Sequence, residues 1–263
     1  FFMVSANDLI LFYLGLELQS LSLYILAAID RDNLRSSESG IKYFVLSALS
    51  SGLLLYGCSL LYGFTGSTNF DLIANQLTKE NVGAVFAMVF ILVGLAFKVS
   101  AVPFHMWTPD VYQGAPTIVT AFISTAPKVA VFGVLIRLLV FPFGEIIVDW
   151  GKLVIILSIT SMIIGSLGAI MQSDIKRLMA YSTINHIGFM LMGLVPGTED
   201  GITAISIYLI LYLTMNLGVF LFVLNMQRDQ INVTSIKDLS GLYKTEPIMA
   251  GCLAIILFSM AGI

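Results

Sequence analysis

Four ionisable residues stand inside hydrophobic stretches long enough to cross a bilayer: Glu17, Lys42, Lys98 and Lys128. A charge in the hydrocarbon core costs about 2.5–3.5 kcal/mol on insertion scales, so such residues are rare in membrane helices. A carboxylate and several amines at this depth can hand on protons, because each can exist with or without its proton. The pattern indicates a path for protons or other cations through the membrane interior.

Composition places the chain in a membrane. The 263 residues are 58% hydrophobic and only 11% charged, whereas soluble domains carry about 25% charged residues. A net charge of −3 argues against a nucleic-acid partner. The 2 histidines and 2 cysteines are scattered and give no metal-ligand spacing. Phosphate-binding, haem and iron–sulfur motifs are also missing from the sequence, so we expect no metal or redox cofactor on this chain.

Hydrophobic runs of about 20 residues predict membrane-spanning helices. The sequence therefore predicts an all-α polytopic bundle, with a short interfacial helix within Asn69–Glu80. Both ends fall within apolar runs, so we expect further polypeptide to supply additional helices. The seven predicted full spans and one partial span lie at 8–29, 38–63, 81–102, 116–140, 153–171, 175–195, 202–226 and 247–263.

Basic residues are unevenly shared between the two predicted sides of the bundle. Lys176 and Arg177 belong to the richer side and are interpreted as orientation determinants. Because cytoplasmic loops carry the excess of Lys and Arg, the richer side is predicted to face the cytoplasm or the mitochondrial matrix. The richer side holds Arg31, Arg35, Lys176, Arg177, Arg228, Lys237 and Lys244, and the other side holds Lys79 and Lys152.

One predicted span is interrupted. Beyond Lys98, the fourteen residues 103–116 hold Pro103, Pro109, Gly114 and Pro116, and a regular helix does not continue through such a run. The segment is nevertheless aromatic and weakly charged. Non-helical backbone at membrane depth is tolerated only where it is buried in protein or lines a cavity, and discontinuous helices mark binding sites in transporters.

Five segments in order give the chain a family resemblance. They resemble the antiporter-like membrane subunits of respiratory complex I, and most nearly the subunit N family, called NADH dehydrogenase subunit 2 in mitochondria. The sibling families usually carry a histidine-containing run where this sequence has Thr120–Ser124. The five segments are YLGLELQSLSLYILAA (13–28), GIKYFVLSALSSGLLLYG (40–57), FKVSAVPFHMWTPDVYQGAPT (97–117), STAPKVAVF (124–132) and DIKRLMAYSTINHIGFMLMG (174–193).

The resemblance implies a fold of two inverted five-helix repeats, each with a broken helix. Residues 1–140 would form the first repeat, with a partial start and a break near 98–116. Residues 141–263 would form the second repeat, truncated at its later broken helix. The implied function is that of a proton-translocating membrane-arm subunit of NADH:quinone oxidoreductase, in a bacterial plasma membrane or the mitochondrial inner membrane. Partner subunits would carry NAD, FMN, iron–sulfur clusters and quinone.

The resemblance also assigns roles to the buried charges. Glu17 would pair with Lys98, and Lys128 would be the central lysine of the path. Burial disfavours a charged amine and a nearby carboxylate favours it, so a change in their separation would load or release a proton. The alternatives are a structural ion pair for Glu17 and a side chain that snorkels to the interface for Lys98 and, more strongly, for Lys42.

Three further residues are candidates for the same path. His186 lies mid-span with Ser182 one turn before it, and this polar stripe indicates either a water-assisted relay or ordinary hydrogen bonding between helices. His105 and Asp110 flank the broken segment. They are predicted either to hold that loop or to line the cytoplasmic mouth of the path.

Two other functions fit the same residues. The chain could belong to a multi-subunit cation/proton antiporter that has no redox partner, or it could be a scaffold of the membrane arm that pumps nothing. The antiporter would show sodium-dependent transport without NADH oxidation. The scaffold would keep its charges only for assembly.

Overall fold

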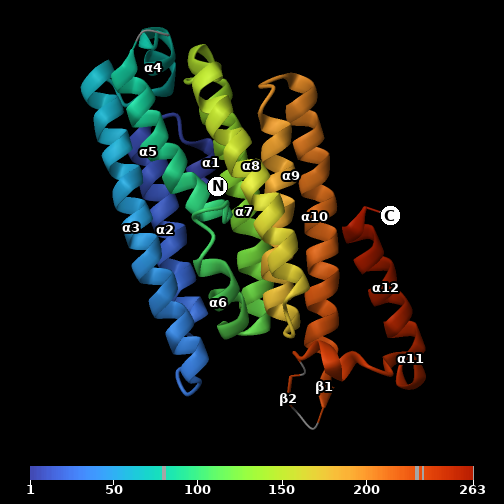
Figure 1. The fold of residues 1–263 in the computed structure, drawn as a ribbon. Helices are drawn as coiled ribbons and strands as arrows, with labels where there is room; N and C mark the ends of the chain where they lie inside the picture. The colour runs from blue at the N-terminus through green and yellow to red at the C-terminus, as the bar shows by residue number, and fades with distance from the viewer. Residues whose placement is uncertain (79–80, 229–230, 233, 263) are drawn as a thin grey trace.

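The chain forms a bundle of long, roughly parallel helices with α3 at one edge and α12 at the other (Figure 1). The structure is a computed structural model that describes residues 1–78, 81–228, 231–232 and 234–262. Its elements are α1 (Phe2–Ser5), α2 (Leu9–Ala27), α3 (Leu34–Thr65), α4 (Phe70–Gln76), α5 (Val82–Val99), α6 (Trp107–Gly114), α7 (Thr117–Val140), η1 (Gly144–Ile146), α8 (Ile147–Ile170), α9 (Ile175–Leu194), α10 (Glu199–Asn225), β1 (Gln227–Arg228), β2 (Ile231–Asn232), η2 (Ile236–Leu239), α11 (Leu242–Thr245) and α12 (Pro247–Ala261).

Every predicted span corresponds to a helix. Within the described residues, six helices are long and apolar enough to cross a membrane: α2, α3, α5, α7, α8 with η1, and α10. Helix α9 has 20 residues but is not among the six, because its polar stripe lowers its hydropathy. Large apolar side chains on the outer faces, such as Leu18 and Ile25, are mostly exposed. A bilayer would cover these faces, so the all-α membrane fold is confirmed.

Polar side chains set the helix starts. Each accepts a hydrogen bond from a backbone amide of the first turn that has no partner inside the helix. These caps begin α2, α3, α4, α5, α9 and α10 at Asp8, Asn33, Asn69, Asn81, Asp174 and Thr198.

One predicted connector was wrong over part of its length, and one predicted helix lies only partly within the described residues. The connector predicted at 141–152 was wrong from residue 147 onward, because Asp149 and Lys152 lie inside α8. A helix can extend past its apolar stretch, and an acid in its first turn is favourable beside the helix dipole. The predicted interfacial helix is observed as α4, while Lys79 and Glu80 lie outside the described residues.

The predicted break is confirmed. Helix α5 ends at Val99, the chain turns through residues 100–106, α6 follows, and α7 starts at Thr117. Ser100 closes α5 with a φ of 73°, a left-handed conformation that non-glycine residues rarely adopt. Helix α6 packs against both α3 and α9, between which it lies in Figure 1. The break therefore places a short polar helix between the two halves of the chain.

Candidate functional site

Glu17 and Lys98 each contact a serine of α3. The Ser51 hydroxyl donates to Glu17 Oε1, and Lys98 Nζ donates to Ser47 Oγ at 2.6 Å. Ser47 and Ser51 are four residues apart, so both lie on one face of α3. Within the described residues the ion pairs do not include Glu17 or Lys98. The predicted partners thus lie against neighbouring turns of one face of α3, each with its own serine, and form no ion pair with each other.

The Lys98 amine lies in a pocket of hydroxyl oxygens. It also donates to Ser20 Oγ at 2.7 Å and to Tyr24 OH at 3.5 Å, and Tyr24 in turn donates to Ser47 at 2.5 Å. The lysine is 8% exposed, so its side chain turns into the bundle and does not snorkel. Among the described residues, hydroxyl oxygens are its hydrogen-bond acceptors, and no carboxylate contacts it.

Lys128 is the most deeply buried charge, with 0% of its surface exposed. It extends from α7 to the end of α5, where its amine donates to Val99 O at 2.8 Å, to Lys98 O at 3.2 Å and to the Ser100 hydroxyl. The last carbonyls of a helix have no helical donors and carry the negative end of its dipole. The broken helix therefore supplies the counter-charge that Lys128 lacks elsewhere.

Trp107 completes the surroundings of Lys128. The Lys128 amine lies 5.0 Å from the Trp107 ring centre, within the range of a cation–π contact. The indole N–H donates to Phe97 O at 2.9 Å, and the ring stacks on Tyr43 at 4.4 Å. Helix α6 thus fixes one wall of the lysine site.

His186 is buried on α9 and makes a hydrogen bond to the neighbouring helix α10. Its Nδ1 lies 2.8 Å from Tyr208 OH on α10, and its ring centre lies 5.7 Å from that of Tyr212. Which ring nitrogen carries the proton determines whether Nδ1 donates or accepts. The polar stripe of α9 therefore turns toward α10.

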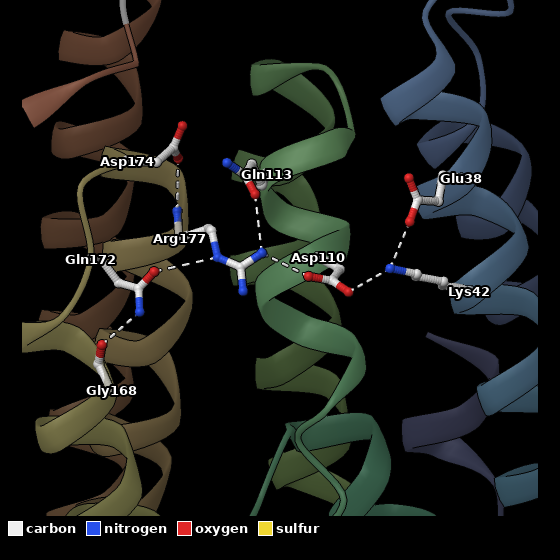
Figure 2. A network of polar contacts seen from close by, with 8 residues as sticks. All are labelled: Glu38, Lys42, Asp110, Gln113, Gly168, Gln172, Asp174 and Arg177. Carbon is white, nitrogen blue, oxygen red and sulfur yellow. Dashed lines mark hydrogen bonds and ion pairs between the residues drawn. The ribbon is translucent and has the colours of Figure 1, made fainter.

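Lys42 and Asp110 meet in a polar network at the α6 end of the bundle (Figure 2). Lys42 Nζ lies 2.7 Å from Asp110 Oδ2 and 2.7 Å from Glu38 Oε1. Arg177 Nη1 lies 2.7 Å from Asp110 Oδ1 and donates to Gln113 Oε1 at 3.1 Å. One carboxylate on α6 thus joins α3 to α9, beside a cavity of about 240 Å³.

Electrostatics favour the ionised form of Asp110. Partial burial raises the pKa of the carboxyl, but the hydrogen bonds from Lys42 and Arg177 outweigh it and hold the pKa below its usual value. His105 does not join this network. Burial lowers its pKa, and its Nδ1 has no hydrogen-bond partner among the described residues.

Lys176 binds the C-terminal end of α6. It is 5% exposed, and its amine donates to Ala115 O at 2.5 Å and to Gln113 O at 3.1 Å. Arg177 and Lys176 thus bind α9 to the broken segment through hydrogen bonds. Counting the basic residues on the two sides of the membrane does not reveal this contact. Two lysines, Lys128 and Lys176, bind the carbonyl ends of the two helical pieces α5 and α6.

Several polar residues of the site were missed from sequence. Ser20 and Tyr24 on α2, and Ser47 and Ser51 on α3, are spaced four residues apart within apolar helices, and that spacing was the available signal. Within the described part of the chain, no three or more His, Cys, Asp or Glu side chains gather as metal ligands would. The site is accordingly one of lysines, hydroxyls and backbone carbonyls.

Comparison with known families fits this arrangement. The model of the family described as NADH:quinone oxidoreductase/Mrp antiporter, TM, matches residues 6–263. The chain belongs to this family. Its predicted resemblance to the antiporter-like subunits of complex I, and to subunit N among them, is confirmed.

Curated relatives carry a consistent name. NADH-quinone oxidoreductase subunit N of Parvibaculum lavamentivorans is 54% identical over 265 residues, covering 100% of this chain and 55% of the relative. Subunit N of Pelagibacter ubique is 57% identical over 261 residues, covering 99% of this chain and 55% of the relative. The chain therefore spans about half the length of the curated relatives it matches.

Solved structures share the fold. Respiratory complex I from Thermus thermophilus with bound Aureothin contains a chain that is 34% identical, with a TM-score of 0.84, covering 100% of this chain and 56% of that one. The Mrp complex from Dietzia sp. contains a chain that is 25% identical, with a TM-score of 0.83, covering 98% of this chain and 48% of that one. The antiporter-like fold is therefore common to a redox-linked complex and to an Mrp complex.

Proposed function

We propose that this chain is part of a proton-translocating membrane-arm subunit of an NADH:quinone oxidoreductase in a bacterial plasma membrane. The observation that carries the proposal is the contact of Lys128 with the backbone of Lys98. It brings two buried lysines to one helix break, and the first of them and Glu17 contact serines one turn apart on α3. Bacterial relatives named subunit N support both the complex and the membrane.

The chain's own residues would move the proton. A proton on the Lys98 amine is stabilised when the Ser20, Ser47 and Tyr24 oxygens accept from it. A second charge on Lys128 opposes it, because like charges repel strongly in a low dielectric. Any movement of Glu17 relative to Ser51 and Ser47 would change how strongly the charged form of Lys98 is stabilised. When this stabilisation weakens, the proton would pass from Lys98 toward Lys128.

Asp110 and Lys42 would form the cytoplasmic mouth of this path. Their network is partly exposed, with side-chain exposures of 35% for Asp110 and 41% for Lys42, and it borders the cavity beside α6. The energy would come from redox chemistry on partner subunits. These subunits would hold NAD, FMN, iron–sulfur clusters and quinone, and no electron would enter this chain.

A cation/proton antiporter is the second candidate, favoured by the likeness to the Mrp complex chain. Membrane vesicles from cells that lack the gene, complemented with the complete protein, separate the two. The oxidoreductase subunit restores a proton gradient on addition of NADH and migrates with the NADH-oxidising band on native gels. The antiporter restores proton flux only when sodium is added, and that result would contradict the proposal. A scaffold restores NADH oxidation without any proton gradient attributable to Lys98 or Lys128.

A further inference from the structure

Two backbone carbonyls at the end of α5 lack the partners that a continuing helix would give them. In a regular helix Lys98 O would accept from the amide of Val102, but that amide donates to Ser161 Oγ on α8 at 2.9 Å. Val99 O would accept from Pro103, which has no N–H. Both carbonyls are therefore open to another donor or to a cation.

The carbonyl one residue earlier already has its donors. Phe97 O accepts from Trp107 Nε1 at 2.9 Å and from the amide of Ser100 at 3.0 Å. Among the described residues, the donor that reaches both open carbonyls is the amine of Lys128. The break thus leaves two oxygens that a single positively charged group satisfies.

Ser100 adds a third oxygen to this set. Its hydroxyl accepts from the Lys128 amine, and its φ of 73° lies in the left-handed region. Backbone in such sparsely populated regions is concentrated at active sites and ligand clamps. Three oxygens thus converge on the point that the Lys128 nitrogen occupies, and the lysine is 0% exposed.

The electrostatics of this point suit a monovalent cation. The carbonyl end of a helix carries about −0.5 elementary charge, and the Trp107 ring, 5.0 Å from the Lys128 amine, also favours a positive charge. Within the described residues no carboxylate pairs with Lys128. Ca²⁺ is bound largely by carboxylates, whereas unwound carbonyls and the C-terminal ends of broken helices coordinate Na⁺ in transporters.

We propose that the end of α5 is a binding site for a monovalent metal cation such as Na⁺, and that the amine of Lys128 occupies it in place of the ion. The side chain fills the site whether or not the amine carries its proton, so Na⁺ is excluded. Lys128 is therefore a specificity-determining residue, which keeps the helix break selective for protons over sodium. This inference rests on the proposed function, in which Lys128 carries protons.

Two substitutions of Lys128 distinguish an empty site from a filled one. Lys128→Ala removes the amine and its stem, and leaves space beside the three oxygens for a cation and water. Lys128→Met also removes the amine but keeps the space filled, so it is the matched control. Each variant is made in the complete protein within the assembled complex. Retention of radiolabelled Na⁺ is then measured over a range of Na⁺ concentrations, with choline holding the ionic strength constant.

We expect Lys128→Ala to retain one more Na⁺ per complex than Lys128→Met, with saturation, while the wild type matches Lys128→Met. Adding Ser100→Gly to Lys128→Ala should weaken this binding, because it removes one oxygen ligand from a position where glycine is unstrained. Equal Na⁺ retention in Lys128→Ala and Lys128→Met would overturn the inference.

Proton translocation decides the proposed function separately. Protons translocated per electron are measured in vesicles during NADH oxidation for the same variants. A wild-type ratio in Lys128→Met would overturn the proposed function, whatever the Na⁺ retention of Lys128→Ala. A lowered ratio in Lys128→Met beside equal Na⁺ retention in the two variants would overturn the cation site alone.

Assembly gives a second readout where Lys128→Ala is unstable. Native electrophoresis compares the intact complex after extraction in sodium and in choline. Assembly that sodium restores and choline does not supports the cation site, because the ion replaces the contacts of the lost amine. A Lys128→Ala complex that assembles in neither salt, while Lys128→Met assembles in both, contradicts it.

Discussion

The amine of Lys128 donates to the backbone carbonyl of Lys98 at 3.2 Å. The contact exists because α5 stops at Val99 and leaves its last carbonyls without helical donors. One lysine is thus held by the peptide that carries the other, and any movement of the α5 end shifts both amines together. The break in the helix is for this reason also the point that positions both buried lysines.

A substitution of Ser100 allows the stability of the backbone at this break to be measured separately from proton translocation. Glycine adopts positive φ about as readily as negative φ, and the left-handed conformation costs other residues about 1–2 kcal/mol. Ser100→Gly should therefore leave the stability of the complex unchanged or slightly raised. It should nevertheless lower protons translocated per electron, because Lys128 loses a hydroxyl acceptor. Thermal inactivation and vesicle acidification measure the two effects, and a wild-type proton ratio would show that the hydroxyl is dispensable.

Ser51 should matter more than an ordinary helix serine. It is 4% exposed and donates to Glu17, so Ser51→Ala leaves a carboxylate oxygen without this donor at a cost of about 1–3 kcal/mol. We expect Ser51→Ala to lower proton translocation by a larger fraction than it lowers the thermal stability of the complex. Ser22→Ala is the matched control, because Ser22 bonds only to its own helix at Leu18 O. Equal effects of the two changes on translocation would contradict the role of Ser51.

The ionised carboxylate of Asp110 should stabilise the folded protein at neutral pH. Asp110→Asn removes the charge that Lys42 and Arg177 share, and partly exposed ion pairs contribute about 0.2–1 kcal/mol each. Because the pKa of Asp110 lies below its usual value of 3.8, its contribution is present above that value and is lost as the pH falls through the lowered pKa. The difference in thermal stability between wild type and Asp110→Asn should stay constant between about pH 5 and 8. A difference that vanishes near neutrality would contradict the assignment.

The contribution of Lys176 to stability should depend on both the charge and the length of its side chain. Lys176→Met keeps the side-chain length but leaves Gln113 O and Ala115 O without their donor, at about 1–3 kcal/mol for each carbonyl. We expect lower thermal stability of the complex and increased proteolysis at the α6–α7 junction. Lys176→Arg should restore part of the loss. Lys152→Met, at the opposite side of the bundle on α8 and without an assigned contact to α6, provides the comparison, and equal losses in both would show that net charge alone matters.

Much of the fold followed from hydropathy, because a bilayer demands long apolar runs and breaks in them are conspicuous. The eight spans and the interruption after Lys98 were predicted for this reason. The start of α8 was misplaced, since the apolar run begins only after Asp149 and Lys152, whereas the helix already begins at Ile147. Helix ends follow from caps and packing as well as from hydropathy.

The site was only partly predictable. The buried charges themselves were conspicuous, because Lys98 and Lys128 interrupt apolar segments. Their partners are serines, tyrosines and backbone carbonyls, residue types that are common in membrane helices and give no signal by themselves. Whether Lys128 would bind a carboxylate or a helix end depended on the path of residues 100–106, which local propensity does not determine. Roles along the path stay predictions until variants are measured.

The central claim is that Lys128 carries protons during NADH oxidation. Lys128→Met keeps the bulk of the side chain and removes its amine. In the complete protein within its assembled complex, we measure NADH oxidation and proton uptake in the same vesicles. We expect electron transfer to quinone to continue while protons translocated per electron fall below the wild-type value. A wild-type ratio at intact electron transfer would contradict it.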